Sequence, residues 1–256
     1  MSVLSEQQVA GYWRDGYAFV ENALEPAQLD ALQSDFEVWK EESCGHATPW
    51  GTTADGRARF DLEPGHCAEH PALRRVASPI EVSDAYLDVM RNGRVVDAVA
   101  QLIGPDVEFN NSKINSKQPG TATQVKYHQD FSFQPHCNGV FTGAVSTDVA
   151  DRAERDAVPC VGPAGSACLM HTRVVHGSGP NHTTVPRTLF IAEYRSEDSV
   201  PLQVNHLPSR YEGELVRGTR SGRVRCTDYE MLFPEVPTSA SFFYQQAAAE
   251  PPREKR

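Results

Sequence analysis

Residues 125–133 of the 256-residue chain read VKYHQDFSF, and this stretch indicates which kind of fold the sequence encodes. Its residues alternate with the period of a β-strand, on which side chains two positions apart project to the same face. His128 and Asp130 therefore share a face on which a buried core would favour Val or Ile. We interpret the pair as two ligands aimed at one metal ion.

The rest of the chain divides into a helical first part and a strand-rich second part. Ser5 followed three positions later by Gln8 is typical of a capping box, and apolar residues recur with helical spacing over residues 26–42. Two more helical patterns lie between residues 80 and 103. Period-two alternation marks residues 107–120, 123–133, 166–177 and 187–198.

We predict one domain over residues 1–256. Its parts are a helical N-terminal part (1–104), a β-core with the metal site (105–200) and a C-terminal extension (201–256). Residues 44–70 lack periodicity and are expected to form a long loop. The tail, FFYQQAAAEPPREKR, has a composition that buries little apolar surface, so we expect it to be frayed.

The bulk composition narrows the classes of function. The chain has 34 acidic and 24 basic residues, a net charge of -10, which disfavours nucleic acid and anionic membranes as partners. The N-terminus does not resemble a signal peptide, and no apolar run approaches bilayer length. The six cysteines form no C-x-x-C pair. These features predict a cytoplasmic protein whose main partner is not a polyanion.

A third metal ligand is needed from elsewhere in the chain, and His176 is the candidate. It ends the strand-like segment SACLMHTRVVHG, just before a Gly-Ser-Gly turn. Two imidazoles and one carboxylate form the facial triad of non-haem Fe(II) oxygenases, whereas structural zinc sites usually recruit cysteines. Arg187 lies on the next strand-like run, and a buried arginine there would need an anionic partner.

These motifs together resemble a known family. YHQDF, followed by VVHGSGPNHTTVPRTLFIAEY, is similar to the phytanoyl-CoA dioxygenase family, whose Fe(II)- and 2-oxoglutarate-dependent oxygenases include ectoine hydroxylases. The resemblance implies a mainly β fold, a double-stranded β-helix (jelly roll, cupin-like) core with flanking N-terminal α-helices. It also implies that Arg187 and Ser178 bind the far carboxylate of 2-oxoglutarate and that Asn115 contacts the cosubstrate.

Other polar and aromatic residues near these motifs are weaker candidates. Lys113 and Lys117 alternate with Asn115 onto one strand face, which is either a pocket wall or a solvated edge strand. We also count Gln129 and Phe131 as candidate substrate contacts, and we expect Phe133 in the core.

Two further groups could imitate functional residues. His136, Cys137 and His171 lie near the triad in sequence and could pass for metal ligands, but we expect them to be structural. A series of basic residues near the C-terminus has two interpretations: it binds an anionic substrate such as a CoA phosphate, or it is a solvated loop. Its members are Arg217, Arg220, Arg223 and Arg225.

The interval between His128 and His176 is shorter than in the family. FSFQPHCNGVFTGAV passes directly into an acidic stretch, without the G-x-L-x-x-x-P-G-S-H motif of relatives. We predict a missing or deleted segment near residues 138–139. Either an internal piece is absent from the sequence, or the protein is a shortened homologue.

The leading hypothesis is a 2-oxoglutarate-dependent dioxygenase. It would use Fe(II), 2-oxoglutarate and O2 to hydroxylate or otherwise oxidise an unactivated C–H bond of a small molecule, with succinate and CO2 as co-products. Asp130 favours hydroxylation, because halogenating relatives lack this carboxylate. The alternatives are a non-catalytic homologue acting as a binding protein and a cupin-like zinc or manganese enzyme, which would leave Arg187 unexplained.

Overall fold

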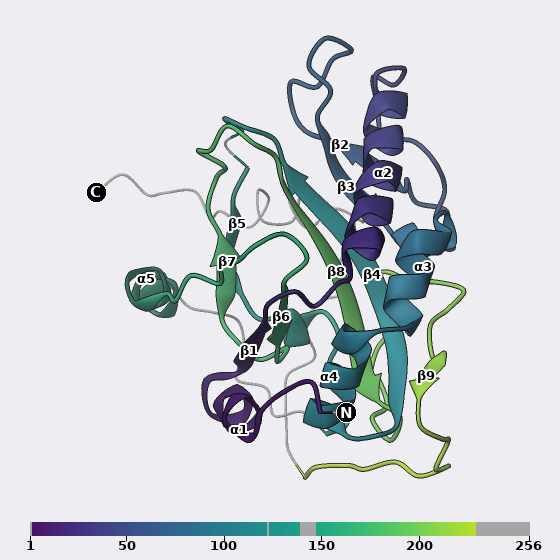
Figure 1. Ribbon diagram of the computed structural model, residues 1–256, viewed down its shortest axis with the longest axis vertical. Coiled ribbons are helices and arrows are strands. Elements are labelled where there is room, and N and C mark those ends of the chain that lie inside the picture. Colours follow the sequence, from purple (N-terminus) through teal and green to yellow (C-terminus); the bar gives the residue numbers. More distant parts are fainter. Residues whose placement is uncertain (1, 122, 139–146, 229–256) are drawn as a thin grey trace.

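The computed structural model describes residues 2–121, 123–138 and 147–228, and its elements follow the predicted order from helices to strands (Figure 1). The helices are α1 (Glu6–Asp15), α2 (Pro26–Ser43), α3 (Asp84–Arg91), α4 (Arg94–Ile103) and α5 (Thr147–Asp156). The strands are β1 (Tyr17–Val20), β2 (Phe60–Leu62), β3 (Leu73–Ala77), β4 (Val107–Lys117), β5 (Val125–His128), β6 (Ala167–Met170), β7 (His176–Ser178), β8 (Arg187–Ser196) and β9 (Leu215–Arg217).

The predicted N-terminal helices are confirmed. Ser5 caps α1, and its side chain and that of Gln8 bond each other's backbone in a capping box. The apolar stripe of α2 buries Leu32, Phe36 and Trp39. The first 104 residues also contain β1, β2 and β3, so this part of the chain is not purely helical.

The main sheet is antiparallel and is built around β4. Its strand order is β2-β3-β4-β8, and β9 also pairs with β4. Asn115 on β4 lies opposite Arg75 on one side and Leu189 on the other. Because β4 is paired along both edges, its interpretation as a solvated edge strand is wrong.

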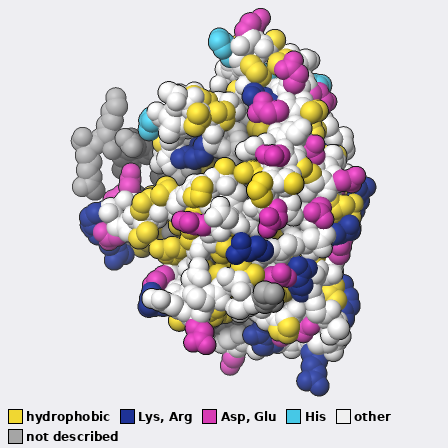
Figure 2. Space-filling view, in the orientation of Figure 1, with side chains coloured by type: hydrophobic (Ala, Val, Ile, Leu, Met, Phe, Trp, Pro, Cys, Tyr) yellow, Lys and Arg dark blue, Asp and Glu magenta, His cyan; other side chains and the backbone are white. Residues whose placement is uncertain are grey.

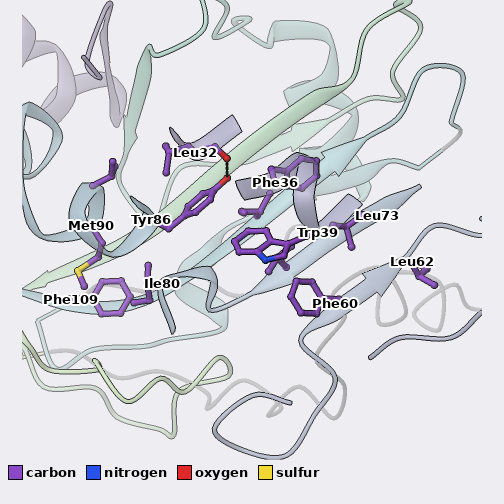
Figure 3. Packing of buried hydrophobic residues seen from close by; sticks show 13 residues of the cluster. Leu32, Phe36, Trp39, Phe60, Leu62, Leu73, Ile80, Tyr86, Met90 and Phe109 are labelled. Carbon is purple, nitrogen blue, oxygen red and sulfur yellow. Dashed lines mark hydrogen bonds between the residues drawn. The ribbon is translucent and has the colours of Figure 1, made fainter. Parts of the chain in front are cut away.

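One face of this sheet packs into the hydrophobic core. Val76, Ile114 and Phe190 project from β3, β4 and β8 against α2 and α3, which cover this face (Figure 1). Trp39 stacks on Tyr86 at 5.5 Å, and the Tyr86 hydroxyl donates a hydrogen bond to the carbonyl of Leu32 (3.1 Å; Figure 3). Between Asn111 and Lys117, beyond an irregularity in the strand, the residues that alternate with Ile114 therefore project to the opposite face.

Two short strand pairs complete the described structure. β1 pairs with β6, and β5 pairs with β7 with His128 directly opposite His176. The prediction that the strand continues through Phe133 is wrong, because β5 ends at His128 and Asp130–Ser132 form a 3₁₀ turn. The backbone N–H of Phe131 fixes this turn by donating to the carbonyl of Thr172 (2.9 Å).

Three further predictions concern loops and ends. Residues 44–70 are mostly loop, as expected, but they also contain β2. The residues just after the predicted break near 138–139 and the tail from residue 229 lie outside the described part of the chain. Among the described residues, no helix is both long enough and apolar enough to cross a membrane.

Candidate metal and cosubstrate site

The three predicted ligands converge on one point between β5 and β7. The Nε2 atom of His128 lies 3.3 Å from Oδ1 of Asp130, and that of His176 lies 3.5 Å from Oδ2. The two imidazole centroids are 4.3 Å apart. The proximity arises from the β5–β7 pairing and the 3₁₀ turn, not from two positions on one strand as the sequence suggested.

Backbone hydrogen bonds determine which ring nitrogens face the cluster. Nδ1 of His128 contacts the carbonyl of Lys126 (2.8 Å), and Nδ1 of His176 contacts the carbonyl of Val174 (3.0 Å). Since a carbonyl only accepts, each Nδ1 carries a proton and donates it, so Nε2 is the ring nitrogen that faces the cluster.

The charge state of the cluster suits a cation. Burial alone would raise the pKa of Asp130, but its contact with His128 and the charge of Lys113 outweigh burial and hold that pKa well below its usual range. Burial lowers the pKa of His176, although Asp130 opposes this. A carboxylate and two neutral imidazoles are the protonation states that a metal ion requires.

The donor set also fits a metal by distance. With metal–ligand bonds of about 2.0–2.2 Å, adjacent ligands at right angles lie about 3 Å apart, close to the observed separations. His128, Asp130 and His176 form the one three-residue metal-competent group found among the described residues. Their side chains are 17%, 22% and 21% exposed, so a further ligand can reach the cluster.

A second cluster, which we call the cationic cradle, consists of Lys117, Ser178 and Arg187. Nη2 of Arg187 donates to Oγ of Ser178 (2.9 Å), and Nζ of Lys117 donates to the same oxygen (3.1 Å). Ser178 follows His176 by two positions on β7, so both side chains share a face about 7 Å apart. Cradle and metal ligands therefore line one side of the strand.

Asn181, in the predicted H-G-S-x-x-N motif, holds the loop between β7 and β8. Its side chain is fully enclosed, and its amide nitrogen donates to the carbonyls of Lys117 (2.9 Å) and Val185 (2.8 Å). Its amide oxygen accepts from the backbone and hydroxyl of Thr183. Asn181 thus fixes the connection that sets Arg187 beside Ser178.

The structure distributes the other candidates unevenly. Asn115 and Lys113 are half-buried on the site face of β4, and Nζ of Lys113 lies 3.8 Å from Glu193. Gln129 donates to the carbonyl of Arg173. Phe131 is buried (3% exposed).

The prediction that Phe133 belongs to the core is wrong. Phe133 is only half-buried, and its ring lies 6.0 Å from His128 and 5.6 Å from His206. Phe133 is therefore closer to the metal ligands than its role as a core residue implied.

The residues expected to be structural do pack away from the cluster. Nδ1 of His136 bonds the carbonyl of Gln134 (2.7 Å), Cys137 contacts the carbonyl of Arg225, and the ring of His171 lies against Tyr12 and Trp13.

Three of the four C-terminal arginines pair with the protein's own carboxylates. The pairs are Arg217 with Asp97, Arg220 with Glu108, and Arg225 with Asp198. Acidic and basic side chains are likewise interspersed on the face shown in Figure 2. These ion pairs favour the interpretation of the arginines as solvated surface residues and argue against a binding site for a CoA phosphate.

Sequence reasoning missed three charged or polar residues near the site: Arg75, Glu193 and His206. The ring of His206 is deeply buried, and its pKa is held well below the ordinary value by burial and by the charges of Lys113 and Arg75. Burial likewise raises the pKa of Glu193. One signal was visible, since Arg74 and Arg75 interrupt the apolar run ALRRVASPI.

An antiparallel β-core with a two-histidine, one-carboxylate cluster defines a metal-dependent oxygenase of the double-stranded β-helix class. The model of the family described as phytanoyl-CoA dioxygenase (PhyH) matches residues 12–150 and 136–189. The chain belongs to the phytanoyl-CoA dioxygenase family.

Named relatives agree with this membership. The chain is 26% identical over 273 residues to a probable alpha-ketoglutarate-dependent hypophosphite dioxygenase of Stutzerimonas stutzeri, covering 91% of this chain and 92% of the relative. It is 23% identical over 249 residues to an ectoine dioxygenase of Nocardia farcinica, covering 75% and 78%. The crystal structure of EctD from S. alaskensis with bound Fe superposes with a TM-score of 0.63 at 19% identity, covering 86% and 89%. The predicted fold class is confirmed.

Proposed function

We propose that the protein is an Fe(II)- and 2-oxoglutarate-dependent dioxygenase that hydroxylates a C–H bond of a small molecule. His128, Asp130 and His176 would hold the iron, and the cationic cradle would hold the far carboxylate of 2-oxoglutarate. The observation that carries the proposal is the position of the cradle two residues along β7 from a metal ligand, on the same face.

The hydrogen bonds of Ser178 prepare it to donate. A hydroxyl has two lone pairs and one proton, and both lone pairs here face charged donors, from Lys117 and Arg187. The remaining O–H is therefore available for a carboxylate oxygen. Ser178 is thus a hydroxyl donor oriented by two cations.

Arg187 has donors to spare. Its Nη2 group donates to Ser178 and to the carbonyl of Gly179 (2.6 Å), while its Nε and Nη1 groups have no hydrogen-bond partner among the described residues. A guanidinium with free N–H groups binds a carboxylate in a planar, bidentate geometry that lysine does not reproduce. Arg187 is exposed and not buried, contrary to the interpretation from the sequence, so it is accessible to a cosubstrate.

The other side chains would shape the reaction space. On the site face, Asn115 lies between its partners on the neighbouring strands, Arg75 of β3 and Leu189 of β8, where its amide would contact the cosubstrate. When bound, iron would activate O2 as the oxidant, and 2-oxoglutarate would supply two of the four electrons that O2 takes up, with succinate and CO2 as co-products of hydroxylation. The protein's own part is to orient these groups and the substrate.

The substrate is proposed only as a small molecule. The relatives are named for two chemically different substrates, hypophosphite and ectoine, so their names do not select one. The net charge of -10 supports neither nucleic acid nor an anionic membrane as a partner, and a cytoplasmic location remains a prediction from composition.

The test is succinate formation from 2-oxoglutarate by protein reconstituted anaerobically with Fe(II) and then exposed to O2. We expect slow uncoupled turnover that requires iron and is abolished in Asp130→Ala. Arg187→Met should raise the KM for 2-oxoglutarate strongly, and Arg187→Lys should raise it less.

Two results would favour the alternatives. Absence of decarboxylation in protein that is folded and iron-loaded would favour a non-catalytic binding protein. Metal-dependent activity that is insensitive to Arg187→Met would favour a metalloenzyme that does not use 2-oxoglutarate.

A further inference from the structure

Arg75 is a buried cation on the site face of the main sheet. It lies on β3 directly opposite Asn115, so the two side chains project to the same face. Only 4% of Arg75 is exposed. A guanidinium in such a position normally has a carboxylate or several carbonyl oxygens around it.

The acid nearest to Arg75 is already engaged by another arginine. Asp61, directly across from Arg75 on β2, accepts from Nη2 of Arg74 at 2.6 Å.

Arg75 itself has no hydrogen bond or ion pair among the residues that the structure describes, and its Nε is enclosed without an acceptor. Burial lowers the pKa of Arg75 to about 10, while Asp61 opposes the shift, so the group stays charged at neutral pH. An unpaired buried charge destabilises a fold, so an anion that binds Arg75 would offset this cost.

Arg75 is linked electrostatically to the metal cluster through His206. The charges of Lys113 and Arg75 lower the pKa of His206, and Asp130 raises it, so all three charges act on one buried imidazole. The ring of His206 is linked to the ligand His128 through Phe133. Arg75 therefore lies on the sheet face that carries Lys113 and Asn115, and its charge acts on the same imidazole as the metal ligand Asp130.

The position of Arg75 is distinct from that of the cationic cradle. Arg187 pairs with Lys117, whereas Arg75 pairs with Asn115, which in turn pairs with Leu189. Two strand spacings and two residues thus separate the Cα atoms of Arg75 and Arg187 by about 12 Å. A carboxylate bound in the cradle leaves Arg75 without a partner.

We propose that Arg75 binds an oxyanion head group of the substrate, a carboxylate, phosphonate or phosphinate, beside the Lys113–Glu193 ion pair. This inference rests on the proposed function, because it assigns the cradle to 2-oxoglutarate and leaves Arg75 to the substrate. Bidentate binding to the guanidinium orients the substrate relative to the metal.

The test uses full-length protein loaded with Mn(II) and 2-oxoglutarate, and acetate, methylphosphonate, inorganic phosphate and methanesulfonate as probes. Thermal unfolding and titration calorimetry measure binding of each probe to wild type, Arg75→Met, Arg75→Lys and Arg187→Met. We expect at least one anion to stabilise wild type, with affinity reduced about tenfold to a hundredfold in Arg75→Met and less in Arg75→Lys.

Two internal comparisons separate a binding role from a structural one. Without an anion, Arg75→Met should unfold at the wild-type temperature or above it, because the substitution removes an unpaired buried charge. Arg187→Met should lose 2-oxoglutarate binding but still be stabilised by the oxyanion. Arg75→Met should still bind 2-oxoglutarate but should not be stabilised by the oxyanion.

The proposal is overturned if none of the four anions stabilises wild type, or if Arg75→Met and Arg75→Lys respond to them as wild type does. It is also overturned if the response follows Arg187 instead. Failure of wild type to bind 2-oxoglutarate would contradict the proposed function. Stabilisation by an anion that depends on Arg75 is measured separately, so the failure of one proposal can be distinguished from the failure of the other.

Discussion

Gly177 separates the metal ligand His176 from the cradle residue Ser178, and it packs tightly against β5. A Cβ atom at this position would lie 3.0 Å from the carbonyl oxygen of Val125 and 3.3 Å from the ring of Tyr127. The nearest obstacle is backbone, which cannot rotate away as a side chain can. We therefore predict that Gly177→Ala forces β5 and β7 apart and separates His128 from His176.

The magnitude follows from the cost of overpacking. An added methyl group in a tightly packed position costs about 1–3 kcal/mol. Because β5 and β7 pair only with each other among the described strands, we expect strand separation to relieve this strain. Metal binding must then restore the close pairing, so the dissociation constant for the metal should rise about 5-fold to 150-fold.

The assay is anaerobic titration calorimetry with Mn(II) as a redox-stable substitute for Fe(II), alongside thermal unfolding of the metal-free protein. Gly179→Ala is the matched control, since a Cβ atom there meets nothing within 4 Å. The reasoning is refuted if Gly177→Ala binds Mn(II) as tightly as wild type, or if Gly179→Ala weakens binding equally.

Three further outcomes are expected. Burial and the charge of Arg187 lower the pKa of Lys117 to about 8, while Glu63 opposes this shift. Because an anion binds the protonated lysine better, the affinity for 2-oxoglutarate, measured by calorimetry, should fall as the pH rises through about 8. Lys117→Met should make this affinity nearly independent of pH. Phe109 is fully buried, so Phe109→Ala should cost about 3–5 kcal/mol in denaturant unfolding while leaving the wild-type m-value. Mn(II) at a hundred times its dissociation constant should stabilise wild type by about 2.7 kcal/mol, a gain that His176→Ala should lose and a chelator should reverse.

The strands of the main sheet were predictable because their pattern is local. Period-two alternation over residues 107–117 and 187–196 follows from the pleat, and the structure places β4 and β8 there. The end of β5 was not predictable. Residues 129–132 keep the alternation of a strand, and a hydrogen bond from Phe131 to the distant Thr172 imposes the turn.

The part of the site that consists of short sequence motifs could be predicted. His128, Asp130 and His176 are brought together as expected, although the reason given for the first two was wrong. Arg75 and His206 were not found, because their significance depends on which partners they lack or share after folding. No pattern along the chain shows that Asp61, the acid opposite Arg75, already binds Arg74.

The two faces of β4 are separable for engineering. Phe109 and Ile114 belong to the hydrophobic core, while Lys113 and Asn115 project to the reaction side. Libraries restricted to positions 113 and 115 avoid the core residues of this strand, which makes these two positions a practical starting point for directed evolution.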